Sequence, residues 1–174
     1  MTAEIEKQAV QRIQLTLKSS SEEDTLQIGE ILAAGLRPGM IVALFGSLGS
    51  GKTVLVKGIC RGLSVPPEEV SSPSFTILNI YDGRLPVFHF DFYRLQSGTQ
   101  WAELGVHEYF YGEGVTLIEW PDRLGDELPA EAVQVFLRRV LPVTQETQNQ
   151  RILVIRNFDL PVSELSRFIT EENG

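Results

Sequence analysis

The stretch Met40–Thr53 reads MIVALFGSLGSGKT, and it decides the fold that we expect. Its first part, Met40–Phe45, is a continuous apolar run, the pattern of a strand buried on both faces of a parallel sheet. The run that follows, Gly46–Thr53, has the full phosphate-loop spacing G-x4-G-K-[ST]. Its glycines let the backbone curl until several N–H groups point at phosphate oxygens. The stretch therefore predicts a buried strand, a phosphate-binding loop and a helix that starts at the loop.

Two side chains of this loop carry specific expectations. Lys52 would bridge the β- and γ-phosphates of a nucleotide as a compact charge, and Thr53 would give its hydroxyl to magnesium. The helix that follows adds unpaired N–H donors and a favourable dipole at its first turn. We therefore predict that ATP or ADP binds here with Mg2+. The predicted nucleotide-binding residues of this segment are Gly46, Ser47, Leu48, Gly49, Ser50, Gly51, Lys52, Thr53 and Val54.

Upstream of the loop, the pattern predicts one strand and one helix. Arg12–Leu17 (RIQLTL) alternates polar and apolar residues, as a half-buried strand does. Ser20 and Glu23 have the spacing of a capping box, and the acids beside them suit the positive end of a helix. An apolar face follows, and Gly35 is the expected end of this helix.

Downstream of the loop, the chain predicts further strands with short connections. Phe75–Tyr81 and Pro86–Phe92 read as two strands joined through residues 82–84 (DGR), which is a hairpin signal. Val115–Glu119 (VTLIE) is a second apolar run of the buried type. The last expected elements are strands in Ala132–Leu141 and Arg151–Arg156 and a helix in Val162–Thr170.

Length and composition fit one globular unit, since the 174 residues are 43% hydrophobic and 22% charged. We predict a single α/β domain of the P-loop NTPase type over residues 1–174, with a mixed parallel and antiparallel sheet flanked by helices. Residues 1–11 and 171–174 are the expected flexible ends. No apolar run has the length of a membrane span, and residues 1–17 lack the apolar centre of a secretory signal. One cysteine, Cys60, allows no internal disulfide, so we expect a cytoplasmic protein without membrane association.

The charge balance argues against direct binding of nucleic acid. The net charge is −8, and only four lysines occur. Nucleic-acid binders need basic surface to displace counterions from phosphates, and this chain offers little beyond the pair Arg138-Arg139. We therefore expect no direct DNA binding, and we expect any role with RNA to run through a partner protein.

Two acids follow apolar strands, at the edge where a parallel sheet opens its ligand crevice. Asp91 ends the run Val87–Phe90, and Glu119 ends the run Val115–Ile118. Hydrolysis of ATP needs a ligand for magnesium and a group that positions water, and the sequence leaves open which acid does which. The predicted catalytic residues are Asp91, Glu119 and Lys52, and the predicted metal ligands are Thr53, Glu119 and Asp91.

The segment Ser71–Phe75 (SSPSF) lies between the phosphate-loop helix and the next strand. In GTPase-like proteins a mobile loop at this place contacts the γ-phosphate, which makes Ser74 a candidate; a plain proline turn is the alternative. Ras-type GTPases read guanine with Asn-Lys-x-Asp, and no lysine of this chain follows an asparagine, which favours adenine. His89 either orients Asp91 or is a buried histidine of the strand.

Taken in order, these motifs resemble the TsaE (YjeE) family, the small ATPases of bacterial tRNA threonylcarbamoyladenosine biosynthesis. The resemblance covers about residues 21–156. Beyond the phosphate loop, it rests on Ser72–Phe75 (SPSF), His89–Leu95 (HFDFYRL), Leu104-Gly105 before Glu108, and Ile118–Trp120 (IEW). Many families share the phosphate loop, whereas HFDFYRL and IEW are far more specific.

The resemblance implies magnesium-dependent binding of ATP and ADP and slow ATP hydrolysis that rises in complex with partners. In the family these partners are TsaB and TsaD, which transfer the threonylcarbamoyl group to adenosine beside the tRNA anticodon. By match, Asp91 and Glu119 are the functional acids, and Trp120, the aromatic residue beside the second acid, is a predicted nucleotide-binding residue. Thr25 matches a recurrent family threonine near the nucleotide.

This chain departs from the family pattern at two places. The family often has Asp where this chain has Ser47, and it usually has Thr where this chain has Ser74. Both residues keep a polar oxygen, so we expect nucleotide binding to be retained. Ser47 removes a negative charge near the γ-phosphate, which bears on the rate of hydrolysis.

Two other functions start from the same loop. A small-molecule P-loop kinase is one, although such kinases usually close an arginine-bearing lid on the phosphates, and the arginines here are scattered. A nucleotide-dependent binding switch with negligible catalysis is the other, and Ser47 leaves it open.

Overall fold

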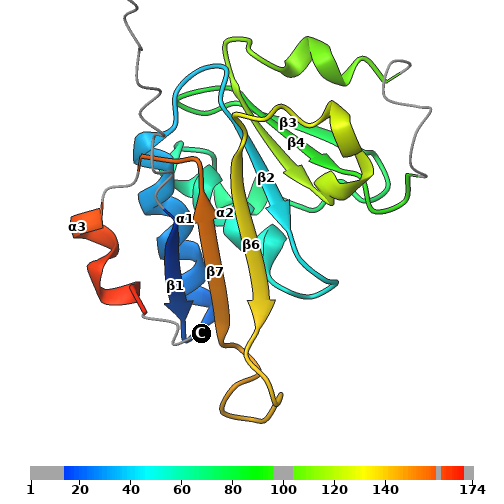
Figure 1. Ribbon diagram of the computed structural model, residues 1–174. Coiled ribbons are helices and arrows are strands. Elements are labelled where there is room, and N and C mark those ends of the chain that lie inside the picture. Colours follow the sequence, from blue (N-terminus) through cyan, green and yellow to red (C-terminus); the bar gives the residue numbers. More distant parts are fainter. Residues whose placement is uncertain (1–13, 96–103, 160–161, 171–174) are drawn as a thin grey trace, which may run out of the picture.

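The computed structural model describes residues 14–95, 104–159 and 162–170. The ends predicted to be flexible lie outside these ranges. The phosphate-loop strand, β2 (Ile41–Phe45), is the central strand of a seven-stranded sheet with the order β1-β7-β6-β2-β5-β4-β3 (Figure 1). The other strands are β1 (Leu15–Ser19), β3 (Leu78–Tyr81), β4 (Val87–Asp91), β5 (Val115–Glu119), β6 (Val133–Arg139) and β7 (Arg151–Arg156).

The sheet is parallel at its centre and antiparallel at both sides. β2 pairs in parallel with β5 and with β6, and β5 pairs in parallel with β4. β1 and β7 extend the sheet antiparallel on one side, and β3 does so on the other. The predicted mixed α/β sheet is confirmed, and the four parallel strands end at one edge.

Helices cover the two faces of the sheet unequally. The helices α1 (Glu22–Gly35) and α2 (Lys52–Gly62) pack together on one face, over the main core (Figure 1). A smaller apolar cluster contains Ile41, Phe90 and Ile118 from the strands and residues of the segments that follow β4 and β5. The short helical segments are α3 (Val162–Leu165) and the 3-10 turns η1 (Pro67–Glu69), η2 (Val106–Tyr109), η3 (Pro121–Arg123), η4 (Gly125–Glu127) and η5 (Ser166–Phe168).

Two local predictions need correction. The N-cap of α1 is Ser21, whose Oγ accepts from Asp24 N at 3.0 Å, so the predicted capping box of Ser20 and Glu23 is one residue early. Three acids occur in sequence here, and either register satisfies the capping pattern. β3 starts at Leu78, not Phe75, because Ile77 has a φ of 70° and donates its N–H to the Pro73 carbonyl. The hairpin of β3 and β4 itself is confirmed.

The two long helices approach closely where α2 presents Gly58 to α1. A Cβ built on Gly58 would lie 2.2 Å from the carbonyl oxygen of Leu26. Only glycine allows this contact without movement of the backbone. α2 begins in the phosphate loop and packs against α1, so α1 supports the loop through α2.

The structure also bears on membrane association. Within residues 14–95, 104–159 and 162–170, no helix combines the length and the apolar content needed to cross a bilayer.

The contact at Gly58 leads to a prediction about stability. Gly58→Ala should lower the free energy of unfolding by about 1–3 kcal/mol, because the added methyl group pushes α2 away from α1. Urea unfolding followed by circular dichroism measures this change. Gly112→Ala is the matched control, since a Cβ there meets nothing within 4 Å. Equal stability of the two variants would contradict the close contact.

Candidate nucleotide-binding site

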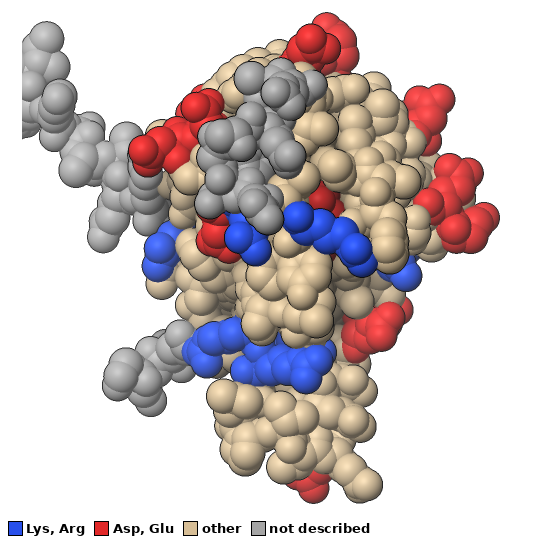
Figure 2. All heavy atoms as spheres, turned by 90° about the vertical axis from the view of Figure 1, so that its right-hand side faces the viewer, with Lys and Arg blue, Asp and Glu red and all other residues tan. Residues whose placement is uncertain are grey.

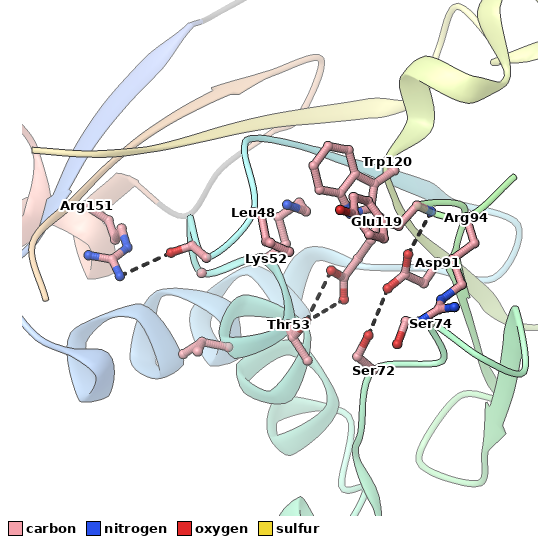
Figure 3. A pocket seen from close by; sticks show the side chains of 14 residues that line it. Leu48, Lys52, Thr53, Ser72, Ser74, Asp91, Arg94, Glu119, Trp120 and Arg151 are labelled. Carbon is pink, nitrogen blue, oxygen red and sulfur yellow. Dashed lines mark hydrogen bonds between the residues drawn. The ribbon is translucent and has the colours of Figure 1, made fainter. Parts of the chain in front are cut away.

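The phosphate loop is already folded into a closed turn at the carboxyl end of β2 (Figure 3). Gly51 has a φ of 104° and is the N-cap of α2, a conformation that side chains with a Cβ rarely adopt. Lys52 Nζ donates to the carbonyl oxygens of Gly46 at 2.8 Å and Ser47 at 2.9 Å. The lysine thus bonds to the carbonyls of its own loop.

Trp120 forms the wall opposite the lysine. Lys52 Nζ lies 4.1 Å from the centroid of the indole ring, a cation–π contact. Trp120 has a φ of 60°, a strained conformation that turns the chain sharply after β5. Burial lowers the pKa of Lys52 from its usual value, while the charges of Glu119 and Asp91 oppose that shift. These carboxylates help to keep the buried amine charged.

Thr53 and Glu119 meet directly at the mouth of the loop. The Thr53 hydroxyl donates to Glu119 Oε1 at 2.9 Å, with Oε2 at 3.2 Å. His89 Nε2 lies 3.0 Å from the same Oε1 atom. Glu119 is 3% exposed and ends β5, so its carboxylate is held at the carboxyl edge of the sheet. Oε1 contacts both Thr53 and His89, whereas Oε2 has the longer contact with Thr53.

Asp91 lies beside Glu119 because the two residues are partners in the register of β4 and β5. Asp91 Oδ2 accepts from the Ser72 hydroxyl at 2.8 Å, and Oδ1 accepts from Tyr93 N at 2.9 Å. The carboxylate is thus oriented by the segment before β3 and by the chain that leaves β4. The two predicted acids are brought together, as the parallel-sheet argument expected.

A pocket of about 370 Å³ opens between these groups. Most of the predicted site residues contact it, including both acids. The pocket is lined by Leu48, Gly49, Gly51, Lys52, Thr53, Val54, Ser72, Ser74, Asp91, Tyr93, Arg94, Glu119, Trp120 and Arg151. Ser72 and Ser74 of the segment 71–75 therefore line the pocket.

Four predicted nucleotide-binding residues lie outside this lining. Gly46 and Ser47 offer carbonyls to Lys52, and Ser50 is buried within the loop. Thr25 lines a small neighbouring cavity of about 40 Å³, together with Gly51. Its hydroxyl is bonded to Ser19 Oγ at 2.7 Å, so this threonine also holds the start of α1 in place.

The oxygen atoms at the pocket suit a hard divalent cation. Thr53, Glu119 and Asp91 offer one hydroxyl and two carboxylates, the ligands that Mg2+ prefers. Within the described part of the chain, no cluster of three or more His, Cys, Asp or Glu side chains is arranged to hold a metal by itself. Magnesium commonly uses one or two protein oxygens and completes its shell with phosphate and water. The residues present could therefore hold magnesium together with a nucleotide.

Two arginines that the motif analysis did not select brace the loop from the hairpin of β6 and β7. Arg151 Nε donates to the Ser50 carbonyl at 2.9 Å, and Arg139 Nε donates to the Gly49 carbonyl at 3.1 Å. The two arginines are partners in the strand register. No sequence motif marks them, since each contact joins residues far apart in the chain.

Comparisons with known proteins agree with the motifs. The family model described as "Threonylcarbamoyl adenosine biosynthesis protein TsaE" matches residues 19–150. The tRNA threonylcarbamoyladenosine biosynthesis protein TsaE of Treponema pallidum (strain Nichols) is 43% identical over 120 residues, 69% of this chain and 88% of the relative. The protein of the same name from Bacillus subtilis (strain 168) is 37% identical over 155 residues, 88% and 95% of the two chains. The crystal structure of Bacillus subtilis YdiB superposes with a TM-score of 0.69 at 33% identity, covering 90% of this chain and 96% of the other.

The arginine brace can be tested without any ligand. Arg151→Ala should speed hydrogen exchange of the amides in residues 46–51 by about tenfold, because a charge-assisted hydrogen bond to the loop is lost. Mass spectrometry of the exchanged protein reports this segment directly. Arg156→Ala is the control, since that arginine is on the same strand but bonds to Gln14. Unchanged exchange in Arg151→Ala would show that the loop holds its shape without the brace.

Proposed function

The chain belongs to the TsaE family, and we propose that it acts in tRNA threonylcarbamoyladenosine biosynthesis as a magnesium-dependent protein that binds and hydrolyses ATP. The observation that carries the ATP part is the contact of Thr53 with Glu119 at the mouth of the loop that also holds Lys52. A hydroxyl, a carboxylate and an amine converge there as phosphoryl chemistry requires.

Electrostatics support an anionic ligand despite the net charge of −8. The phosphate loop projects from the right-hand side of Figure 1, and on the face seen from that side Lys and Arg side chains gather in two bands (Figure 2). Asp and Glu side chains lie mainly toward the edges of the same view. Lys52, Arg94 and Arg151 line the pocket together with the two acids, and basic side chains of this kind attract an anionic ligand.

Binding of ATP would redirect the lysine. Among the residues that the structure describes, the close contacts of Lys52 Nζ are with two loop carbonyls and the Trp120 ring. A γ-phosphate is a stronger acceptor than a carbonyl oxygen, because the bond is then assisted by charge on both sides. The loop amides and the N-terminus of α2 would hold the remaining phosphate oxygens.

The contacts favour different roles for the two acids. We assign the metal side to Thr53 and Glu119, because the Thr53 hydroxyl is already aligned with the carboxylate and its contact with Oε2, at 3.2 Å, is longer than its contact with Oε1, at 2.9 Å. When bound, magnesium would neutralise charge on the β- and γ-phosphate oxygens. Asp91 has each oxygen bonded to a different donor, Ser72 and Tyr93, which fixes the plane of the carboxylate. We assign to Asp91 the positioning of the water that attacks the γ-phosphate.

The rim of the pocket suits contact with partner proteins. Leu48 is 70% exposed, Phe75 is 79% exposed and Tyr93 is 42% exposed, and all three belong to segments that line the pocket. Exposed apolar side chains around a ligand site are typical of interaction surfaces. We propose that TsaB- and TsaD-like proteins bind here, that tRNA is reached only through them, and that ATP hydrolysis resets their cycle.

The phosphate-loop assignment is tested by nucleotide binding. Lys52→Ala should weaken ADP binding by at least about 100-fold, since a charge-assisted contact with the phosphates is lost. Isothermal titration calorimetry with Mg2+ measures the dissociation constant. Lys57→Ala, on the same helix, is the matched control and should bind as the unaltered chain does. Near-normal ADP affinity in Lys52→Ala would overturn the assignment.

The acid roles are tested by turnover with TsaB and TsaD present. Glu119→Gln should lower kcat and raise the Mg2+ concentration needed for half-maximal turnover. Asp91→Asn should lower kcat by about 100-fold while the Mg2+ requirement stays the same, because in the proposed roles Asp91 positions the water and Glu119 holds the metal. Wild-type rates in both variants would refute the roles. Phosphate transfer to a small metabolite in a substrate panel would replace the proposal with a kinase, and absent turnover with intact binding would replace it with a binding switch.

A further inference from the structure

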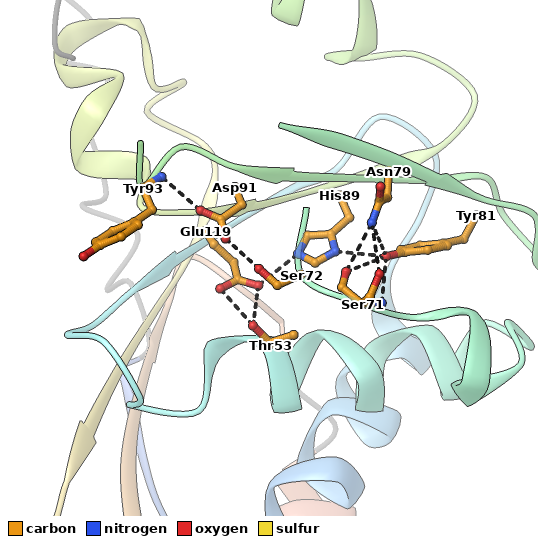
Figure 4. Close-up of polar contacts among 9 residues, drawn as sticks. All are labelled: Thr53, Ser71, Ser72, Asn79, Tyr81, His89, Asp91, Tyr93 and Glu119. Atoms are coloured by element: carbon orange, nitrogen blue, oxygen red, sulfur yellow. Dashed lines mark hydrogen bonds and ion pairs between the residues drawn. The ribbon is translucent and has the colours of Figure 1, made fainter. Parts of the chain in front are cut away.

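Three neighbouring strands place one polar side chain each in a buried row that leads away from the pocket (Figure 4). Tyr81 ends β3, His89 is the middle residue of β4, and Glu119 ends β5. Their exposed fractions are 5%, 0% and 3%. The sequence left open whether His89 orients Asp91, and in the structure the His89 ring contacts Glu119 instead.

The strand register explains why His89 reaches Glu119. Asp91 is the direct partner of Glu119 across β4 and β5, and His89 lies two residues earlier on the same face of β4. Diagonal neighbours of this kind are within reach of long side chains. His89 Nε2 lies 3.0 Å from Glu119 Oε1, and His89 Nδ1 lies 3.4 Å from the Tyr81 hydroxyl. The imidazole therefore bridges the two side chains.

The far end of the row holds the segment that precedes β3. The Tyr81 hydroxyl donates to the Ser71 carbonyl at 2.9 Å and accepts from Ser71 N at 3.3 Å. Asn79 Nδ2 bonds to both the Tyr81 hydroxyl at 3.1 Å and the Ser71 carbonyl at 3.3 Å. Ser71 is thus held by two side chains of β3.

The next residue of that segment closes the path. Ser72 donates to Asp91, so the segment held by Tyr81 also orients the second acid of the pocket. A continuous chain of contacts therefore joins Glu119 to Asp91 through His89, Tyr81 and the Ser71–Ser72 backbone (Figure 4). The two acids are linked at the back of the site as well as by their strand pairing.

We propose that His89 and Tyr81 are positioning residues that couple the Glu119 carboxylate to the Ser71–Ser72 segment and through it to Asp91. This inference rests on the proposed ATP hydrolysis and adds to it a link between the acids and the segment beside the γ-phosphate. Buried partners behind a functional carboxylate commonly fix its orientation and tune its affinity for a metal.

A competition for one proton gives the coupling its physical basis. In the neutral form of the imidazole, His89 Nε2 carries the hydrogen, because the Glu119 carboxylate accepts hydrogen bonds, and Nδ1 is left as an acceptor. The Tyr81 hydroxyl has a single proton, and both the Ser71 carbonyl and His89 Nδ1 can accept it. A shift of Ser71 away from Tyr81 would turn that proton toward His89. The position of the segment therefore affects how firmly His89 holds Glu119.

The row has a simpler alternative role, which is to stabilise the sheet. Removal of a buried hydrogen bond lowers the stability of the fold wherever the bond lies, so a loss of stability cannot distinguish the two roles. A positioning role requires that kcat falls while the ATP concentration for half-maximal turnover stays nearly constant. It also requires that substitution of His89 changes the hydrogen exchange of the Ser71–Ser72 segment.

The test uses the full chain with TsaB and TsaD and compares variants that remove one contact at a time. Tyr81→Phe keeps the ring and removes the hydroxyl, while Tyr111→Phe is the matched control, because its hydroxyl bonds to Glu131 on the surface. His89→Gln can keep a donor near the Nε2 position, whereas His89→Asn is too short to reach Glu119. We expect kcat to fall by about 10–100-fold in Tyr81→Phe and His89→Asn, with partial recovery in His89→Gln.

A second measurement keeps the inference testable if turnover is absent. Hydrogen exchange of residues 71–77 in the isolated chain should be faster in His89→Asn than in the unaltered protein, although His89 makes no described bond to that segment. A kcat within twofold of wild type in both Tyr81→Phe and His89→Asn, with unchanged exchange, would overturn the coupling. If the unaltered protein lacked turnover but His89→Asn changed the exchange, the proposed hydrolysis would fail and the coupling would remain.

Discussion

Parallel pairing of β2, β5 and β4 brings three strand ends to one edge of the sheet. β2 delivers the phosphate loop to that edge, and β5 and β4 deliver Glu119 and Asp91. Because neighbouring strands lie about 4.8 Å apart, the register alone sets the spacing between the acids and the loop. The rest of the site depends on this geometry, since Thr53 and Ser72 reach their carboxylates only when the strands end together.

Burial strengthens the electrostatic interactions of these polar groups, but their removal from water costs free energy. Lys52, Asp91 and Glu119 are each less than 5% exposed, and ions removed from water are stable only when neighbouring groups compensate their charge. The compensation here comes from hydrogen bonds to loop carbonyls, to two hydroxyls and to an imidazole. A network of this kind also aligns the groups before any ligand arrives, which is how enzymes lower the cost of reorganisation.

Basic and exposed apolar side chains lie on the same face of the molecule as the pocket. The chain is acidic overall, yet on the face where the phosphate loop projects Lys and Arg side chains gather in two bands (Figure 2). Exposed apolar residues lie on the segments beside the loop. Phosphate recognition and protein contact can therefore share one face. Under the proposed function, a nucleotide that alters the segment around Ser72 would also alter the surface proposed for partner contact.

The amino-acid sequence by itself determined the parts that depend on near neighbours. The apolar run and the glycine spacing predicted β2, the phosphate loop and α2, because each acts within a few residues of the chain. The apolar strands that end in Asp91 and Glu119 also marked both acids, since a parallel sheet opens its crevice at strand ends. The predicted starts of α1 and β3 differ from the observed starts. At α1, adjacent serines allow two caps, and at β3 an apolar residue lies in a turn.

Only the tertiary structure decided how these parts meet. The contact of His89 with Glu119 joins residues 30 positions apart in the sequence. The hydrogen bond from Arg151 to the Ser50 carbonyl joins residues 101 positions apart. The strand order that places β6 next to β2 has no local signal either, since the apolar pattern of a strand indicates which of its faces are buried but not which strand lies beside it. Register and packing between distant segments are set by the whole core, which is why local sequence identified the acids but not the row of side chains behind them.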